Sequence, residues 1–232
     1  EDIVKLIVVY DNNVYAGAEV SGLRTDWGFA CWVETGTSTV LFDTGGNGAI
    51  LLNNMQRLGL DPAEIDAVVL SHAHGDHTGG LMALLDMGVR PAVYLLDTFP
   101  AGFKETVRRR TTLVEVSGPA EVAPGVHTTG RVDGEIPEEA LAVESEQGLL
   151  VITGCAHPGV VNMVRRAREA VAGDVALALG GFHLGSVSRR EIEQVGDGLA
   201  ALGVQRVAPC HCTGDLARAV LTERWGHDGL LP

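Results

Sequence analysis

One stretch decides how this chain folds, Ser71-His72-Ala73-His74-Gly75-Asp76-His77-Thr78-Gly79-Gly80. It places three histidines and an aspartate within six positions, directly after the apolar run Ala67-Val68-Val69-Leu70. This pattern predicts a buried strand that emerges into a loop rich in metal ligands. Gly79-Gly80 then allows a tight turn into a helix over Leu81 to Met87.

The spacing within the stretch suits two metal ions. His72 and His74, two apart on an extended backbone, can face one ion, while Asp76 and His77, carried round by a glycine, can face a second. Imidazole and carboxylate suit zinc, iron, manganese or nickel. The alternative, a polar loop with chance histidines, fits a single His-x-His pair better than it fits this density of ligands.

An aspartate at the end of an earlier strand is a further candidate. Leu41-Phe42-Asp43-Thr44-Gly45-Gly46 closes a strand predicted over residues 39 to 43. This segment resembles the first motif of the metallo-β-lactamase superfamily, and the resemblance implies that Asp43 lies under the metal site and orients the histidine loop without being a ligand. An Asx-turn is the simpler alternative.

Each later candidate also follows an apolar strand, as expected for a site assembled at one edge of a sheet. His157 and Cys155 follow residues 149 to 153, His183 follows residues 175 to 179, and His211 follows residues 206 to 209. His157 and His211 are expected metal ligands, with a helix cap as the alternative for His157, and Cys155 is an additional candidate. His183 has three open roles: ligand, proton donor or core histidine.

The histidine stretch resembles the metal-binding signature of the metallo-β-lactamase superfamily. The resemblance implies a four-layer αββα sandwich, in which two mixed β-sheets are flanked by helices and one or two divalent metals lie at the edge. The strands and helices of both halves fit this layout. No low-complexity linker separates the halves, so a single domain over residues 1 to 232 is expected.

Further motifs are similar, over most of the chain, to one branch of that superfamily. They are Trp27-Gly28-Phe29, Leu41 to Gly45, Thr153 to Gly159, Gly180 to Leu184 and Pro209 to Gly214. The branch is named for dihydropterin-ribofuranosyl-aminobenzene 5′-phosphate synthase. This resemblance implies a transferase that joins a dihydropterin-methyl diphosphate to an aromatic amine and releases pyrophosphate.

The chain departs from the general superfamily pattern in two places. No Gly-His-Thr-Pro-Gly motif occurs near Thr128 to Arg131, and Cys155 stands where a bridging aspartate is expected. We infer that His157 takes one vacated position and that Cys155 or His183 takes another. The second metal could therefore be weaker or absent.

The residues favour a metal-dependent hydrolase of phosphoester, ester or related bonds. His72, His74 and His157 would hold one ion, and Asp76, His77 and His211 the other. A metal lowers the pKa of bound water from about 15.7 toward roughly 7. The expected catalytic residues are Asp76, which would orient this water, and His183.

Three alternatives to the hydrolase remain: the pterin-type transferase, a non-catalytic metal-binding sensor domain, and an iron enzyme with oxygen chemistry. Zinc is the expected ion, and manganese, iron or magnesium would also fit. The expected substrate is a phosphorylated small molecule. The sequence does not indicate the oligomeric state.

The composition of the chain limits the kinds of partner and the location that can be expected. The 30 acidic and 17 basic residues give a net charge of -13, which disfavours nucleic acid as a partner unless Arg108-Arg109-Arg110 forms a local basic patch. No apolar run approaches the roughly 20 residues of a membrane span. Glu1 to Lys5 lacks a basic signal region, although an upstream segment removed earlier is an alternative, and the expected location is cytoplasmic. The four cysteines are expected to be reduced.

The segment Asp97 to Arg110 allows two interpretations. Pro100, Gly102 and the pair Phe99 and Phe103 could form a lid over the site, or the aromatic rings could be ordinary loop anchors. In Cys210-His211-Cys212, a strand conformation would point both thiols to one side and the histidine to the other.

Overall fold

The computed structural model describes residues 3–13 and 20–229. The chain separates into two compact units: unit 1 comprises Glu1–Ser117 and Val122–Pro124, and unit 2 comprises Gly118–Glu121 and Gly125–Pro232. The single domain over residues 1 to 232 therefore stays a prediction. The interpretation of the first residues falls partly outside the described ones, because residues 1 and 2 are not among them.

The sheet of unit 1 has six strands in the order β1-β2-β3-β4-β5-β6. The β1–β2 and β2–β3 pairs are antiparallel, and from β3 to β6 the pairing is parallel. The central strands are wholly buried apolar runs, as is usual where both faces of a parallel strand are covered. The strands are β1 (Lys5–Tyr10), β2 (Ala30–Glu34), β3 (Thr39–Phe42), β4 (Ala67–Leu70), β5 (Ala92–Leu96) and β6 (Leu113–Val116).

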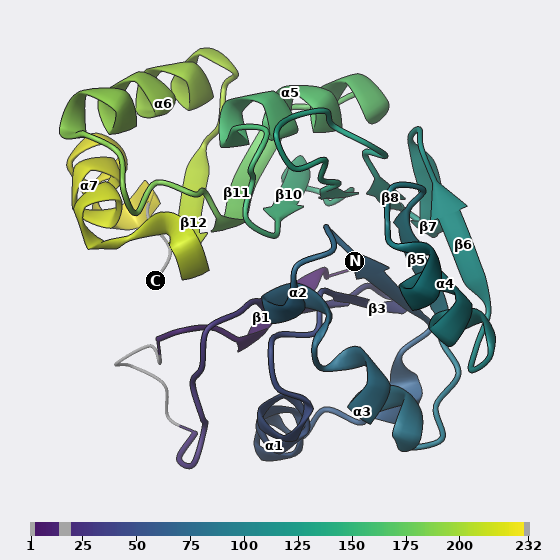
Figure 1. The fold of residues 1–232 in the computed structure, drawn as a ribbon. Coiled ribbons are helices and arrows are strands. Elements are labelled where there is room, and N and C mark those ends of the chain that lie inside the picture. The colour runs from purple at the N-terminus through teal and green to yellow at the C-terminus, as the bar shows by residue number, and fades with distance from the viewer. Residues whose placement is uncertain (1–2, 14–19, 230–232) are drawn as a thin grey trace. The chain divides into compact units, whose positions relative to one another are not determined.

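Short helices connect these strands. In α1 (Gly48–Leu58), the Asn47 side chain accepts hydrogen bonds from the first turn and Gly59 ends the helix at φ 71°. Helix α1 packs against α3 and against β1, and Figure 1 shows α1 and α3 on one side of the sheet. The remaining helical segments of unit 1 are η1 (Pro62–Glu64), α2 (Gly75–Thr78), α3 (Leu81–Asp86) and α4 (Ala101–Arg108).

Unit 2 has a second six-stranded sheet in the order β12-β11-β10-β9-β8-β7. Strands β10, β11 and β12 are parallel, so their carboxyl ends lie at the same edge, whereas β8, β9 and β10 pair antiparallel. The strands are β7 (Ala120–Ala123), β8 (Val126–Thr128), β9 (Leu141–Val143), β10 (Leu149–Thr153), β11 (Val175–Gly181) and β12 (Arg206–Cys210).

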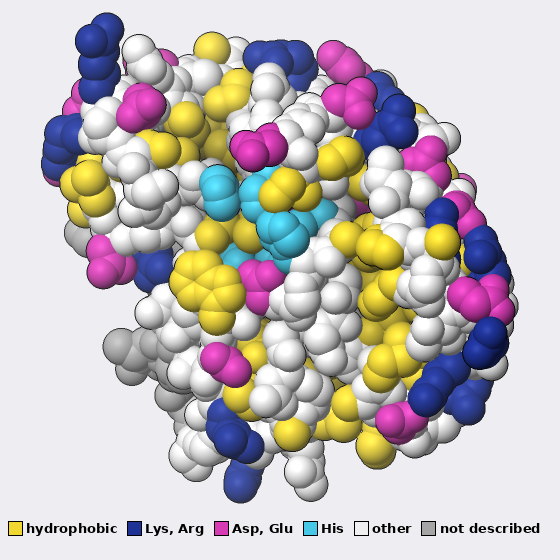
Figure 2. Space-filling model, in the orientation of Figure 1, with side chains coloured by type: hydrophobic (Ala, Val, Ile, Leu, Met, Phe, Trp, Pro, Cys, Tyr) yellow, Lys and Arg dark blue, Asp and Glu magenta, His cyan; other side chains and the backbone are white. Residues whose placement is uncertain are grey.

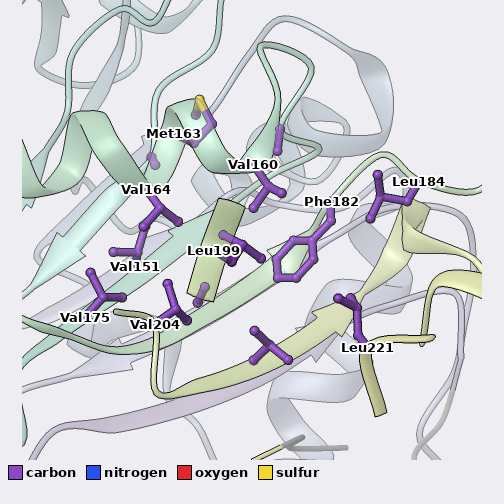
Figure 3. Close-up of a cluster of buried hydrophobic side chains, with 14 of the residues drawn as sticks. Val151, Val160, Met163, Val164, Val175, Phe182, Leu184, Leu199, Val204 and Leu221 are labelled. Atoms are coloured by element: carbon purple, nitrogen blue, oxygen red, sulfur yellow. The ribbon is translucent and has the colours of Figure 1, made fainter. Parts of the chain in front are cut away.

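Three helices close the core of unit 2. Side chains of α5 (Val160–Ala170), α6 (Arg189–Ala201) and α7 (Asp215–Gly229) meet side chains of the sheet in one buried cluster. Figure 3 shows Val164, Leu199 and Leu221 of these helices around Val151 and Phe182. The turn η2 (His211–Thr213) lies between β12 and α7. This packing fixes the strand ends that carry the polar residues.

The two mixed sheets with flanking helices confirm the predicted fold class. The segment Asp97 to Arg110 contains helix α4. The Phe99 ring is buried and lies 5.6 Å from that of Phe103, which supports the anchor interpretation, and the lid stays a prediction. None of the helices that the structure describes has the length and apolar content needed to cross a membrane.

The basic cluster at the end of α4 is matched by carboxylates. Arg109 contacts Glu105 at 3.1 Å, Arg108 contacts Glu115, and Arg110 contacts Asp86. Figure 2 shows acidic side chains interspersed among the basic ones over the region of α4. This mixed surface lacks the uniform positive charge that would favour a phosphate backbone.

Candidate metal centre

The histidine loop of unit 1 begins where β4 ends. His72 and His77 are buried and His74 is exposed. His72 Nε2 lies 3.1 Å from His74 Nδ1. Two nitrogens bound tetrahedrally to zinc at about 2.05 Å lie about 3.3 Å apart, so these two nitrogens are spaced as ligands of one ion.

Asp43 is buried beneath this loop and bonds to it three times. Its Oδ1 accepts the Ser71 N–H at 2.7 Å, and its Oδ2 accepts the Ser71 hydroxyl at 2.7 Å. The same Oδ2 lies 2.7 Å from His77 Nδ1. Because Ser71 donates to Asp43, its oxygen can accept His72 Nδ1–H, 2.9 Å away. Both histidines are thereby held with Nε2 available for a metal, the arrangement usual among metal-binding histidines.

The charges of this pair are strongly perturbed. Burial raises the pKa of Asp43, although His77 and Ser71 act against it. Burial lowers the pKa of His77, but the charge and hydrogen bond of Asp43, with a smaller contribution from Asp76, raise it to about 10. At neutral pH the Nδ1 proton faces Asp43, and a second proton on Nε2 would have to leave before a metal could bind that nitrogen. Asp76 Oδ2 lies 3.5 Å from His77 Nε2.

Glycines bring two other loops of unit 1 against the histidine loop. A Cβ on Gly80 would lie 2.1 Å from the carbonyl oxygen of Thr44, and a Cβ on Gly28 would lie 2.4 Å from that of Asp76. Beside Gly28, Trp27 is 57% exposed. Only glycine allows these backbone approaches, which hold the histidine loop.

In unit 2, strained residues mark the ends of the three parallel strands. Among the residues that the structure describes, four non-glycine residues have positive φ, and three of them follow β10, β11 and β12. They are Ala156 at 61°, His183 at 53° and His211 at 47°. Such conformations cost of order 1–3 kcal/mol each and cluster at functional sites. The fourth is Asp43 at 59°.

Glu138 organises the loop after β10. This fully buried carboxylate accepts the N–H groups of Cys155, Ala156 and His157 at 2.8, 2.9 and 3.0 Å. It also contacts His157 Nδ1 at 3.0 Å, so Nε2 is the nitrogen of that ring that could bind a metal. Sequence analysis missed Glu138. The available signal was the pair Glu138-Glu139 leading directly into an apolar strand.

Two thiols and a histidine lie close together in unit 2. Donor atoms of Cys155, His183 and Cys212 are all within 4.8 Å of one another. The Cys155 hydrogen bond lowers the pKa of Cys212 to about 5, with help from His183 and His211 and against the effect of burial. The hydrogen bond to Cys212 raises the pKa of His183. The rings of His183 and His157 lie 4.5 Å apart.

The structure corrects the prediction for Cys210-His211-Cys212. The strand ends at Cys210 and the turn η2 follows, so the thiols point to different partners. The Cys210 thiol lies 3.3 Å from the Ala208 carbonyl, and the Cys212 thiol lies 3.6 Å from the Cys155 carbonyl.

Residues 28–211 match the family model described as the metallo-β-lactamase superfamily. The chain belongs to this superfamily. A curated relative from Methanocaldococcus jannaschii, 7,8-dihydropterin-6-methyl-4-(β-D-ribofuranosyl)-aminobenzene-5′-phosphate synthase, is 28% identical over 82% of this chain and 80% of its own. An uncharacterised protein of the same organism is 25% identical over 98% of both chains.

A comparison with solved structures supports the same superfamily. The solved structure of Tm1679, described as a metal-dependent hydrolase of the β-lactamase superfamily, has a TM-score of 0.81 at 27% identity and covers 99% of this chain and 95% of its own. A metallo-β-lactamase chain with these relatives is an enzyme of the hydrolase or transferase type. The fold implies divalent metal, and the histidine, aspartate and cysteine donors fit that requirement.

Proposed function

We propose that this metallo-β-lactamase enzyme is a metal-dependent hydrolase of a phosphoester, ester or related bond in a small molecule. The observation that carries the proposal is the way the histidines are held. In each unit a buried carboxylate fixes Nδ1 of a histidine and leaves Nε2 for a metal, Asp43 with His77 and Glu138 with His157. The solved relative described as a metal-dependent hydrolase supports the same reaction class.

The proposed ligands form two sets. His72, His74 and His157 would hold one divalent ion, and Asp76, His77 and His211 would hold the other. These sets rest on the sequence motifs and the family pattern, and the spacing of His72 Nε2 and His74 Nδ1 supports the first of them. Zinc is the proposed ion, because imidazole nitrogens predominate among the donors.

When bound, the ions would lower the pKa of water and polarise the bond to be broken. The protein itself supplies the orientation. Asp43 keeps the proton of His77 on Nδ1, and Ser71 does the same for His72. Asp76, whose side chain is 21% exposed, can accept a hydrogen bond from a water and direct it toward the substrate. His183 is the other proposed catalytic residue.

A second function has specific support. The curated relative at 28% identity is a pterin synthase, which favours a transferase that joins a dihydropterin-methyl diphosphate to an aromatic amine. The exposed Trp27 offers a flat surface suited to a planar ring. A hydrolase would convert a phosphorylated substrate in buffer alone. The transferase would release pyrophosphate only when an arylamine is added.

The same proposal includes a cytoplasmic location. The four cysteines all lie in the part of the chain that the structure describes, and they form no disulfide there. Reduced thiols are usual in the cytoplasm.

Elemental analysis by mass spectrometry tests the ligand sets. We expect up to two divalent ions per chain in the wild type and clearly fewer in His72→Ala and in His211→Ala. His127→Ala is the matched control, because His127 contacts Glu144 at 2.8 Å and belongs to neither set. Metal content equal to that of His127→Ala in either ligand variant would refute the assignment of that residue.

A further inference from the structure

We propose that Cys155, His183 and Cys212 of unit 2 form a zinc site of their own, with two sulfur donors and one nitrogen donor. The site goes beyond the proposed function and does not depend on it, because neither ligand set described above includes Cys212 or His183. The donor atoms of the three residues already lie within 4.8 Å of one another.

The spacing of the donors fits zinc. A tetrahedral zinc with Zn–S distances of about 2.3 Å separates two sulfurs by about 3.8 Å. Donors that start within 4.8 Å therefore need to move by only about 1 Å to bind one ion. Two cysteines and one histidine, with the fourth position open, are a known ligand set of zinc enzymes.

The burial of the three residues fits an open site. Cys155 and Cys212 are buried, so their sulfurs are shielded from bulk solvent, and His183 is exposed. An ion held by these three donors would keep a fourth coordination position. A water or a substrate oxygen could occupy that position.

The backbone of unit 2 passes close to the Cys212 side chain. A Cβ on Gly181 would lie 2.7 Å from the Cys212 sulfur and 3.2 Å from Cys155 Cα, so a glycine is required beside the thiol. Thr213 ties the two loops together, because its hydroxyl accepts the Phe182 N–H at 3.1 Å and donates to the Cys210 carbonyl at 2.6 Å. This tie fixes His183 and Cys212, which are the chain neighbours of the tied residues.

The conformation of His183 also requires support. Its φ of 53° is unfavourable for a non-glycine residue and persists only where the surroundings hold it. A role as metal ligand would explain why this strained backbone conformation is kept at His183. It also decides among the three roles that the sequence leaves open for His183, in favour of ligand over proton donor and core residue.

The experiment uses the full chain, stripped of metal with a chelator under reducing conditions and reloaded with Co²⁺ or Zn²⁺. In the wild type we expect a thiolate-to-cobalt charge-transfer band and, by X-ray absorption, sulfur at about 2.3 Å from zinc. Cys212→Ser should lower the charge-transfer band at least fivefold and bind one equivalent of metal less. The matched control Cys31→Ala removes a buried thiol of β2 and should keep both signals.

A second variant, His183→Ala, keeps the proposal testable if Cys212→Ser does not fold. His183→Ala changes an exposed side chain, and we expect it to keep the sulfur signal while zinc affinity at this site falls about 10- to 100-fold. The proposal is overturned if wild-type zinc has no sulfur neighbour. It is also overturned if the charge-transfer band survives in Cys212→Ser, since Cys155 alone would then supply the sulfur, or if His183→Ala binds zinc as tightly as the wild type.

Discussion

The sharpest test of the metal centre is the substitution Asp43→Asn. Asparagine has nearly the same shape as aspartate and tolerates the φ of 59° found at this position, so the backbone should not change. The amide oxygen can still accept the Ser71 N–H. The amide nitrogen, however, would replace the oxygen that lies 2.7 Å from His77 Nδ1.

The expected magnitude follows from the histidine tautomer. An amide N–H facing Nδ1 forces the His77 proton onto Nε2, the nitrogen proposed to bind metal. Loss of such an orienting carboxylate typically lowers metal affinity 10- to 100-fold, which is about 1.4 to 2.7 kcal/mol. Stability should change less, because burial already disfavours the Asp43 charge and the substitution removes it.

Competition with a chromophoric chelator measures the affinity directly, and thermal unfolding of the metal-free protein provides the stability control. The matched variant is Asp66→Asn, which alters a carboxylate that accepts the Thr39 N–H at 2.9 Å elsewhere in unit 1. The reasoning fails if Asp43→Asn binds metal within about twofold of Asp66→Asn.

Three further outcomes are expected. Glu138→Gln should lower the free energy of unfolding by about 1.5–3 kcal/mol in urea titrations, because a buried charge that accepts three successive N–H groups is lost; a change below about 0.5 kcal/mol would contradict this. Gly80→Ala should cost about 1–3 kcal/mol, because its Cβ would lie 2.1 Å from a backbone oxygen, whereas Gly75→Ala, with open space around it, should be nearly neutral by the same measurement. Burial raises the pKa of Cys31 to about 12 from 9.0, so the folded state keeps its proton when the unfolded state loses it, and stability falls as the pH rises from 9 toward 12. Between pH 8 and 10 this loss is about 1.4 kcal/mol, and urea titrations of Cys31→Ala should show a dependence on pH that is weaker by that amount.

The strands were predictable because apolar runs bounded by turn residues define them. Residues 149–153 form a strand with the predicted bounds in the structure. Helix α4 was missed because Pro100 and Gly102 suggested a loop, whereas the proline precedes the first turn, where its missing N–H costs nothing. Strand β7 was missed because it is short and only half buried, so its sequence has little apolar pattern.

Some of the site residues were predictable from the sequence and others were not. Asp43 and the histidines stand out because they follow apolar strands directly in the sequence. Glu138 does not, because the N–H groups that it accepts come 17 to 19 residues later, and their proximity arises only in the folded unit. The direction of the Cys212 thiol depends on the φ of 47° at His211, a backbone conformation that residue type alone does not indicate.

The two buried carboxylates provide the same function from different places in the sequence. Asp43 accepts a backbone N–H and a hydroxyl of the histidine loop in unit 1, and Glu138 accepts three successive N–H groups in unit 2. Each also fixes Nδ1 of one histidine. A carboxylate that served only to cap its loop would have no need of the imidazole. From the shared contact with the ring we propose that both carboxylates orient ligands, and substitution of either by its amide should then weaken metal binding.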